Sequence, residues 1–227
     1  MENKTSKYFK YAIGEIVLVV IGILIALSIN NWNENRKNTV KETQLLISFK
    51  KDLEKNIIEL ERVIKKSKNT SRKADSVLML QKKEIEDVTL PKLLDFIIYA
   101  TGFTVYSTHE GTVQDILGSG NLDIIKNDSI RLAIGSWEAN IKTIKEFEKM
   151  EKKSVDDYDD YLQLHLDLYK DDSLTILTAK SKEMLLKDRV FLNHLSNRKY
   201  LPKSLNELYK YELPRLQHLI KLIDKEQ

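Results

Sequence analysis

The chain has 227 residues and no cysteine, which excludes a disulfide scaffold, an iron–sulfur cluster, a cysteine-ligated zinc site and a cysteine nucleophile. Its 37 Lys and Arg residues nearly balance its 34 Asp and Glu residues, so overall charge gives no argument for nucleic-acid binding. Only 7 glycines and 3 prolines are present, which favours a mostly helical protein over collagen-like, low-complexity or loop-rich all-β structures.

The first predicted element is an apolar stretch near the N-terminus. Residues 11–29 read YAIGEIVLVVIGILIALSI and contain one charged side chain, Glu15. A bilayer core about 30 Å thick requires about 20 helical residues, so a helix of this length can cross it. We therefore predict a transmembrane helix over residues 11–32, after a short cytoplasmic tail over residues 1–10.

Aromatic residues flank this stretch. Tyr8 and Tyr11 lie at its start and Trp32 follows it, and amphipathic rings of this kind favour the headgroup region of a bilayer. A cleaved signal peptide is the alternative, with Ala26 and Ser28 as a small-x-small cleavage site. The apolar run continues beyond that site and an aromatic anchor follows it, which favours an uncleaved helix.

The charges beside the predicted span do not decide its orientation. Three basic residues precede it and three follow it, so the positive-inside rule gives a tie: Lys4, Lys7 and Lys10, then Arg36, Lys37 and Lys41. A short tail is easily retained in the cytoplasm, whereas long domains are translocated largely regardless of charge. We expect a single-pass inner-membrane protein with a cytoplasmic N-terminus and a periplasmic C-terminal domain.

The apolar stretch and its flanks also carry a family resemblance. Residues 10–37 read KYAIGEIVLVVIGILIALSINNWNENRK. They resemble the N-terminal signature YAIGEI…LVVIGILIAL…INNWNE of a large family of uncharacterised single-span membrane proteins from Gram-negative bacteria. The resemblance is close over this segment and weak beyond it, where it extends at most to LGSGNLDIIKN. It implies an anchor followed by a variable helical region. Because the family is a domain of unknown function, it implies no activity.

One face of the predicted span is polar and lined by small residues. At about 100° per residue, Glu15, Gly22 and Ala26 fall within about 40° of one another, with Asn30 nearby. Small residues four apart let a second helix approach closely, and a charge at membrane depth is costly unless it finds a partner. We expect lateral association through this face. The alternative is that Glu15 reaches the membrane surface and Gly22 is incidental.

The span can continue into a stalk helix, because no glycine or proline occurs between Ile23 and Leu90. We predict an amphipathic stalk over residues 33–86, with apolar residues at spacings of three and four. Residues 34–73 carry 12 basic and 6 acidic side chains, so the stalk is net positive. The polar run Ser67–Ser71 is predicted to be its weakest point.

Residues 87–227 are predicted to form a helical-bundle ectodomain that packs with the stalk. A long helix begins near Ile130, and two helices close the chain over residues 177–196 and 203–225, the last one kinked or restarted by Pro214. The chain offers five to seven helices and no convincing strand, so the fold class is all-α. Short connections favour antiparallel neighbours.

No motif in the sequence points to catalysis or metal binding. His109-Glu110 lacks the second histidine of an HExxH site, and the GSGN run from Gly118 lacks the pattern of a phosphate-binding loop. The acidic stretch from Asp156 to Asp172 lacks the spacing of an EF-hand, so a solvated acidic face is the expected interpretation. Cation binding is one alternative, and contact with the basic stalk, within the bundle or between copies, is another. We expect no enzyme activity, cofactor, metal, nucleic-acid partner or small-molecule substrate.

These features favour a non-enzymatic accessory or scaffold protein that mediates protein–protein association at the inner membrane. Its predicted partners are the lipid bilayer and either itself or another membrane protein. A ligand-sensing periplasmic helical bundle that signals through a membrane partner is the alternative. An unrecognised enzyme, with carboxylates or histidines brought together by the fold, is a lesser one.

Overall fold

The computed structural model describes residues 3–170 and 176–226, and every regular element in them is a helix. The predicted all-α fold class is confirmed, with seven α-helices in these residues. In chain order the elements are α1 (Asn3–Leu80), the 3₁₀ helix η1 (Ile85–Asp87), α2 (Leu90–Ala100), α3 (Gly111–Gly118), the 3₁₀ helix η2 (Asn121–Ile124), α4 (Asp128–Gly135), α5 (Trp137–His165), α7 (Ala179–Lys187) and α8 (Arg189–Glu226).

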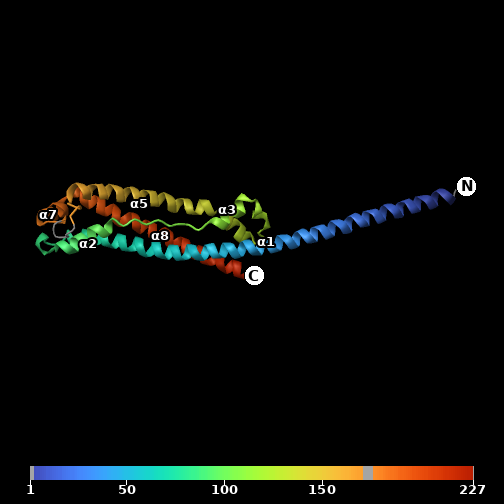
Figure 1. Ribbon diagram of the computed structural model, residues 1–227, viewed down its shortest axis with the longest axis horizontal. Coiled ribbons are helices and arrows are strands. Elements are labelled where there is room, and N and C mark those ends of the chain that lie inside the picture. Colours follow the sequence, from blue (N-terminus) through green and yellow to red (C-terminus); the bar gives the residue numbers. More distant parts are fainter. Residues whose placement is uncertain (1–2, 171–175, 227) are drawn as a thin grey trace.

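The longest element is α1, a continuous helix of 78 residues. Its first part extends alone, whereas its second part packs against the other helices (Figure 1). The first buried side chain described along it is Glu42, whose carboxylate accepts the backbone N–H of Lys126 at 2.6 Å. We call residues 11–32 of α1 the apolar arm, and the described residues from 42 to 226 the helical body.

The helical body is built mainly from α1, α5 and α8, which lie lengthwise along one another (Figure 1). Helix α8 packs against both α1 and α5. Two ion pairs show that α8 runs in the opposite direction to α1, since Lys50 contacts Asp224 at 2.6 Å and Asp75 contacts Lys199 at 2.6 Å. Helices α2 and α3 both pack on α1, and residues 102–110 connect them as an extended thread (Figure 1).

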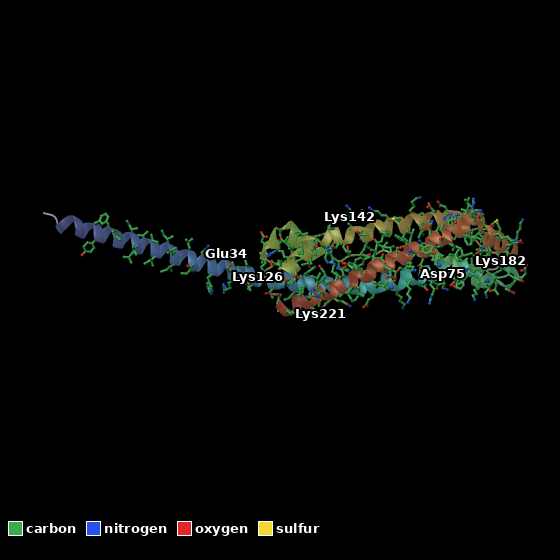
Figure 2. The ribbon with its side chains drawn as sticks, turned by 180° about the vertical axis from the view of Figure 1, so that it is seen from behind. Glu34, Asp75, Lys126, Lys142, Lys182 and Lys221 are labelled. Carbon is green, nitrogen blue, oxygen red and sulfur yellow. The ribbon has the colours of Figure 1, made fainter. Side chains whose placement is uncertain are left out.

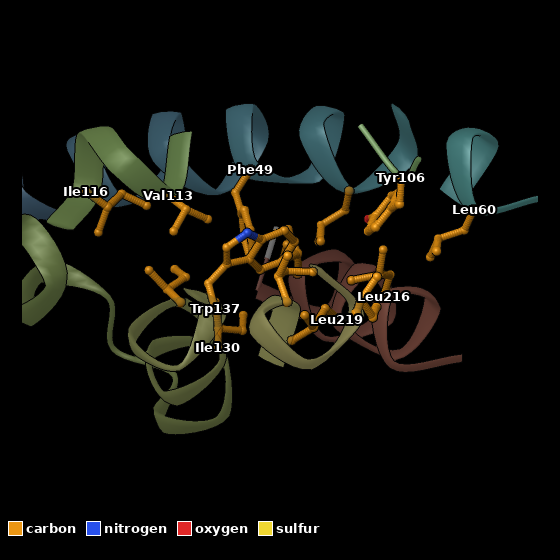
Figure 3. Close-up of a cluster of buried hydrophobic side chains, with 14 of the residues drawn as sticks. Phe49, Leu60, Tyr106, Val113, Ile116, Ile130, Trp137, Leu216 and Leu219 are labelled. Atoms are coloured by element: carbon orange, nitrogen blue, oxygen red, sulfur yellow. The ribbon is translucent and has the colours of Figure 1, made fainter. Parts of the chain in front are cut away.

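Two hydrophobic cores follow one another along the helical body. The core nearer the apolar arm includes Phe49 and Trp137, whose rings meet edge to face with centroids 5.9 Å apart (Figure 3). The core at the far end includes Tyr158 and Phe191, with ring centroids 6.1 Å apart. Buried polar side chains lie between the two cores, and we call them the polar layer: Ser67, Thr70, Thr104, Glu148, Glu151, Ser154, Arg198 and Asn206.

The predicted weak point at Ser67–Ser71 is wrong, because α1 continues through it without a break. The Ser71 hydroxyl donates to the carbonyl of Lys199 at 2.8 Å, and the Ser67 hydroxyl accepts from the side chain of Asn206 at 2.9 Å. Both partners belong to α8. The polar run therefore ties α1 to its neighbour at this point, and α1 ends only at Leu80.

The single long helix predicted from Ile130 is two helices. Helix α4 ends at Gly135 and α5 begins at Trp137. Glycine has a low helix propensity, and the hydroxyl of Ser136 bonds to the carbonyl of Leu132 at 2.8 Å, which caps the end of α4. Both helices still bury the apolar face that the spacing predicted.

The predicted boundaries of the two closing helices are also wrong, because α8 starts at Arg189 and runs unbroken through Pro214. Asp188 begins it as an N-cap residue, since its carboxylate accepts the backbone N–H of Val190 at 2.6 Å. Leu216 and other apolar residues on both sides of the proline are buried in the core. This packing offsets the backbone hydrogen bond that proline cannot make.

Candidate functional site

The apolar arm of α1 is exposed along its whole length. Between Ile13 and Ile29 the large apolar side chains keep 46–70 % of their surface accessible, and the helical body does not reach them (Figure 2). So much apolar surface around a single helix is unfavourable in water. Among the described helices, α1 alone is long and apolar enough to cross a membrane, which is compatible with a single span by composition.

The predicted association face lies on this arm. Glu15, Gly22, Ala26 and Asn30 are all exposed, and apart from the neighbouring backbone of α1 itself no atom comes within 4 Å of a Cβ atom built on Gly22. The face is thus accessible to a neighbouring helix, and association through it stays a prediction.

The predicted interface anchors lie at the two ends of the arm. Tyr11 and Trp32 are 69 % and 65 % exposed, and the guanidinium of Arg36 lies 5.7 Å from the ring centroid of Trp32. The side chain of Tyr8 lies outside the described part of the structure. Just beyond Trp32, basic side chains border a shallow surface hollow, which suits anionic lipid headgroups: Arg36, Lys37 and Lys41.

Farther along, α1 carries a cluster of cations that we call the basic face: Arg62, Lys65, Lys66, Lys68 and Arg72. Together with Asn69 they line a shallow groove on the surface. The segment from Lys65 to Lys73 contains five basic residues and no acidic one. Within the described residues, the three lysines at 65, 66 and 68 form no ion pair, so the fold leaves their charge uncompensated.

Helix α5 carries an acidic face, which we define as Asp156, Asp157, Asp159 and Asp160. The segment 154–165 contains these four carboxylates and no Lys or Arg. The first two pair with lysines of the preceding helical turn, whereas the last forms no ion pair in the described residues. In the described chain, no three His, Asp or Glu side chains are placed to hold a metal ion. Asp171 and Asp172 lie outside the described residues.

The thread of residues 102–110 passes among the long helices without a neighbouring strand. Side chains therefore take up its backbone hydrogen bonds. Asn56 of α1 bonds to both backbone groups of His109. Its Oδ1 accepts the N–H of His109 at 2.8 Å, and its Nδ2 donates to the carbonyl of the same residue at 2.7 Å. Glu59 and Arg62 of the same helix bond to two further backbone groups of the thread.

Glu148 of α5 holds the middle of the thread. Its Oε1 accepts the backbone N–H of Tyr106 at 2.7 Å and the hydroxyl of Tyr209 at 2.9 Å. Lys145 donates to the other carboxylate oxygen at 3.2 Å and also to the carbonyl of Tyr106. Two side chains of α5 thus replace the strand partner that this part of the thread lacks, and Tyr209 of α8 holds one of them, Glu148, in place.

Arg198 of α8 and Glu151 of α5 hold the start of the thread, and both side chains are fully buried. Arg198 donates from Nε to the carbonyl of Ala100 at 2.8 Å, and from Nη2 to the carbonyl of Gly102 and to Glu151 Oε1, the latter at 3.3 Å. Four polar atoms around this ion pair are buried without a hydrogen-bond partner in the described residues: Thr104 Oγ1, Glu151 Oε2, Ser154 Oγ and Arg198 Nη1.

Burial shifts the titration of this pair. Removal from water raises the pKa of the Glu151 carboxyl to about 7, although the nearby Arg198 opposes the shift. Burial likewise lowers the pKa of Arg198, against the attraction of Glu151. The polar layer therefore contains a carboxyl group that titrates near neutral pH inside the helical body.

Asn56→Ala is expected to destabilise the helical body by about 1–3 kcal/mol, because the fully buried Asn56 amide would be lost together with its two hydrogen bonds to the backbone of His109. The exposed amide of Gln44 on the same helix supplies the control, since Gln44→Ala is expected to change stability by less than about 0.5 kcal/mol. Urea unfolding of the full chain in mild detergent, followed by circular dichroism, measures both. Equal effects of the two substitutions would contradict this role of Asn56.

Four buried polar residues with structural roles were not predicted from the sequence: Asn56, Glu148, Glu151 and Arg198. A signal was present in α5, because Glu148 and Glu151 continue the apolar spacing of three and four that begins at Ile141. A charged residue at a position whose periodicity faces the core indicates a buried polar contact.

The two weaker sequence motifs have structural roles here. The backbone of His109 is bound by Asn56, and Glu110 Oε2 accepts the indole N–H of Trp137 at 3.2 Å. In the GSGN run, Gly120 adopts φ = 68°, a left-handed conformation that favours glycine, and it precedes η2.

One protein-family model matches the chain, the Family of unknown function (DUF6090), over residues 15–156. The chain belongs to this family. The DUF6090 match begins at Glu15 in the apolar arm and ends in α5, so it includes the thread and Glu148 but not Arg198. No curated protein and no solved structure matches the chain. The predicted membership of a family of unknown function is confirmed, and membership assigns no activity.

Proposed function

We propose that this DUF6090 protein is a non-enzymatic, single-span inner-membrane protein that mediates protein–protein association as an accessory or scaffold subunit. Its N-terminus lies in the cytoplasm, and its antiparallel helical bundle lies in the periplasm of a Gram-negative cell. The observation that carries the proposal is the apolar arm, which is exposed on every side and is continuous with a packed helical body. The arm also presents a polar, small-residue face to a second helix.

Membrane insertion and orientation are tested in cells. The full chain is expected to stay with the membrane after alkaline carbonate extraction, because about 20 apolar residues anchor it in the bilayer. Protease added to sealed spheroplasts is expected to digest the residues beyond the arm. Release by carbonate would contradict the anchor, and a protected helical body would contradict the orientation.

Association through the arm is tested by substitution. The chain contains no cysteine, so Asn33→Cys, one turn beyond Asn30, supplies a unique crosslinking site. Gly22→Ile with Ala26→Ile is expected to lower the yield of crosslinked species about tenfold, because bulky side chains keep a second helix away.

The matched control adds methyl groups to the other face of the arm. Val17→Ile with Val20→Ile is expected to leave the yield unchanged, since neither position shares the face of Gly22 at about 100° per residue. Affinity purification in mild detergent then identifies the crosslinked partner. A solely monomeric product from the otherwise unchanged chain would contradict the proposed association.

A ligand-sensing function is the second candidate, and the polar layer is the observation that favours it. Four buried polar atoms there lack a partner in the described residues, and such atoms accept water or a small polar molecule. A rise in melting temperature on addition of a small polar metabolite would support this candidate. If the melting temperature is unchanged across a metabolite panel while crosslinking persists, the ligand-sensing function is contradicted and only the association function remains.

A further inference from the structure

The basic face of α1 fits an acidic partner. Its three lysines are exposed, and none of them has an ion-pair partner in the described chain. Clustered like charges repel one another, and a surface of opposite charge relieves that repulsion while steering association. From Lys65 to Arg72 the cations extend over about 11 Å of helix. The partner surface should therefore be a compact acidic one.

The chain itself carries a surface of this kind, the acidic face of α5. Four carboxylates lie within two helical turns, and Asp156, Asp157 and Asp160 are exposed. Lys152 and Lys153 lie in the preceding helical turn and pair with Asp156 and Asp157. The C-terminal end of the face, at Asp160, is therefore its most negative part.

The two faces lie at similar distances from the apolar arm. Arg72 lies about 60 Å beyond Trp32 at 1.5 Å per residue. At the other face, the hydroxyl of Tyr158 in α5 bonds to the backbone of α2 at 3.4 Å, and α2 is tied to α1 by the ion pair of Asp95 with Lys73 at 2.6 Å. The acidic face thus lies within about two helical turns of Arg72 along the helical body.

The two faces cannot meet within one molecule. Helices α1 and α5 form opposite sides of the helical body, with α8 packed against both (Figure 1). A contact between the faces therefore joins two copies, and each copy keeps one face free for a further neighbour. A symmetric contact between two basic faces would instead bring like charges together, which is unfavourable.

From these placements we infer that the basic face of α1 docks against the acidic face of α5 in a second copy anchored in the same membrane. The contact is head-to-tail, so it builds lateral rows of helical bodies. This inference rests on the proposed function, because both copies must stand in one bilayer for the faces to meet at equal height. Shared anchoring also raises the effective concentration of each copy near its neighbour.

Crosslinking between two different single-cysteine chains tests the contact. Full-length Lys68→Cys and Asp160→Cys chains are reconstituted together in lipid vesicles and treated with a short bismaleimide. We expect a crosslinked dimer in the mixture and none from Lys68→Cys alone. The matched control replaces Asp160→Cys with Lys142→Cys, an exposed position on the same helix (Figure 2), and is expected to give none.

Charge reversal tests whether complementarity holds the contact. Adding Lys65→Glu and Lys66→Glu to the Lys68→Cys chain is expected to lower the crosslink yield about tenfold. Adding Asp156→Lys and Asp157→Lys to the Asp160→Cys chain is expected to do the same. Mixing the two reversed chains is expected to restore the yield, because opposite charges then face each other again.

Three outcomes would overturn the inference: no crosslinked dimer in the first mixture, a dimer from Lys68→Cys alone, or a crosslink yield that charge reversal does not change. All substituted side chains are exposed, so unchanged circular dichroism confirms that each variant folds. Crosslinking from Asn33→Cys in the same vesicles separates the two proposals. If the Asn33→Cys crosslink persists while the crosslink between positions 68 and 160 is absent, the head-to-tail row is contradicted and the proposed association function stands.

Discussion

Arg198→Met is expected to destabilise the helical body by about 3–5 kcal/mol, the largest effect that we expect from one substitution. Arg198 is fully buried and bonds to the carbonyls of Ala100 and Gly102 as well as to Glu151. Methionine fills a similar volume but donates no hydrogen bond. The substitution therefore leaves a buried carboxyl and two buried carbonyl groups without their partner.

Urea unfolding of the full chain in mild detergent measures the loss, with Arg189→Met as the control. Arg189 is exposed at the start of the same helix, so its replacement is expected to cost less than about 0.5 kcal/mol. Arg198→Met with Glu151→Met removes both buried charges and is expected to be more stable than Arg198→Met alone. A single substitution at Arg198 that costs less than about 1 kcal/mol would contradict this account.

The free energy of unfolding is expected to fall by about 2 kcal/mol between pH 5 and pH 8 because of Glu151. Burial raises the pKa of this carboxyl from 4.5 to about 7 in the folded chain. Between these values the folded state binds a proton that the unfolded state has released. Stability is therefore greatest at the acidic side of the window and is lost as the pH rises toward 7.

Glu151→Gln isolates this contribution, because glutamine keeps the shape and cannot ionise. Its unfolding free energy is expected to be flatter than that of the unchanged chain across pH 5 to 8. Glu59 and Asp188 do not interfere, since hydrogen bonds lower their pKa values and both stay ionised throughout this window. Parallel pH profiles for the two chains would contradict a raised pKa at Glu151.

Much of the fold is predictable from local rules. The absence of Gly and Pro from residues 24–89 allowed a single helix to leave the apolar stretch, and α1 continues to Leu80. The all-α class follows from composition and from the spacing of apolar residues. The boundaries at Gly135 and Asp188 were missed, because a glycine or an aspartate inside a periodic pattern does not by itself reveal where packing ends a helix.

The polar layer could not be predicted in the same way. Arg198 bonds to groups nearly one hundred positions earlier in the chain, and no local pattern indicates such a contact. The hydrogen bonds of the thread could not be predicted either, since its backbone partners are side chains from three helices. Glu148 and Glu151 are charged residues at positions that continue an apolar spacing, so the sequence indicated a buried polar contact without identifying its partner.

Because α1 is a single unbroken helix, a tilt at its membrane end moves its far end. From Trp32 to Leu80 this helix extends for about 72 Å, and no glycine or proline interrupts it. Membrane helices tilt to match the thickness of the bilayer. If the arm spans as proposed, a change in tilt of about 10° sweeps Leu80 sideways by about 12 Å. The thickness of the membrane would then determine the sideways position of the end of α1 at Leu80.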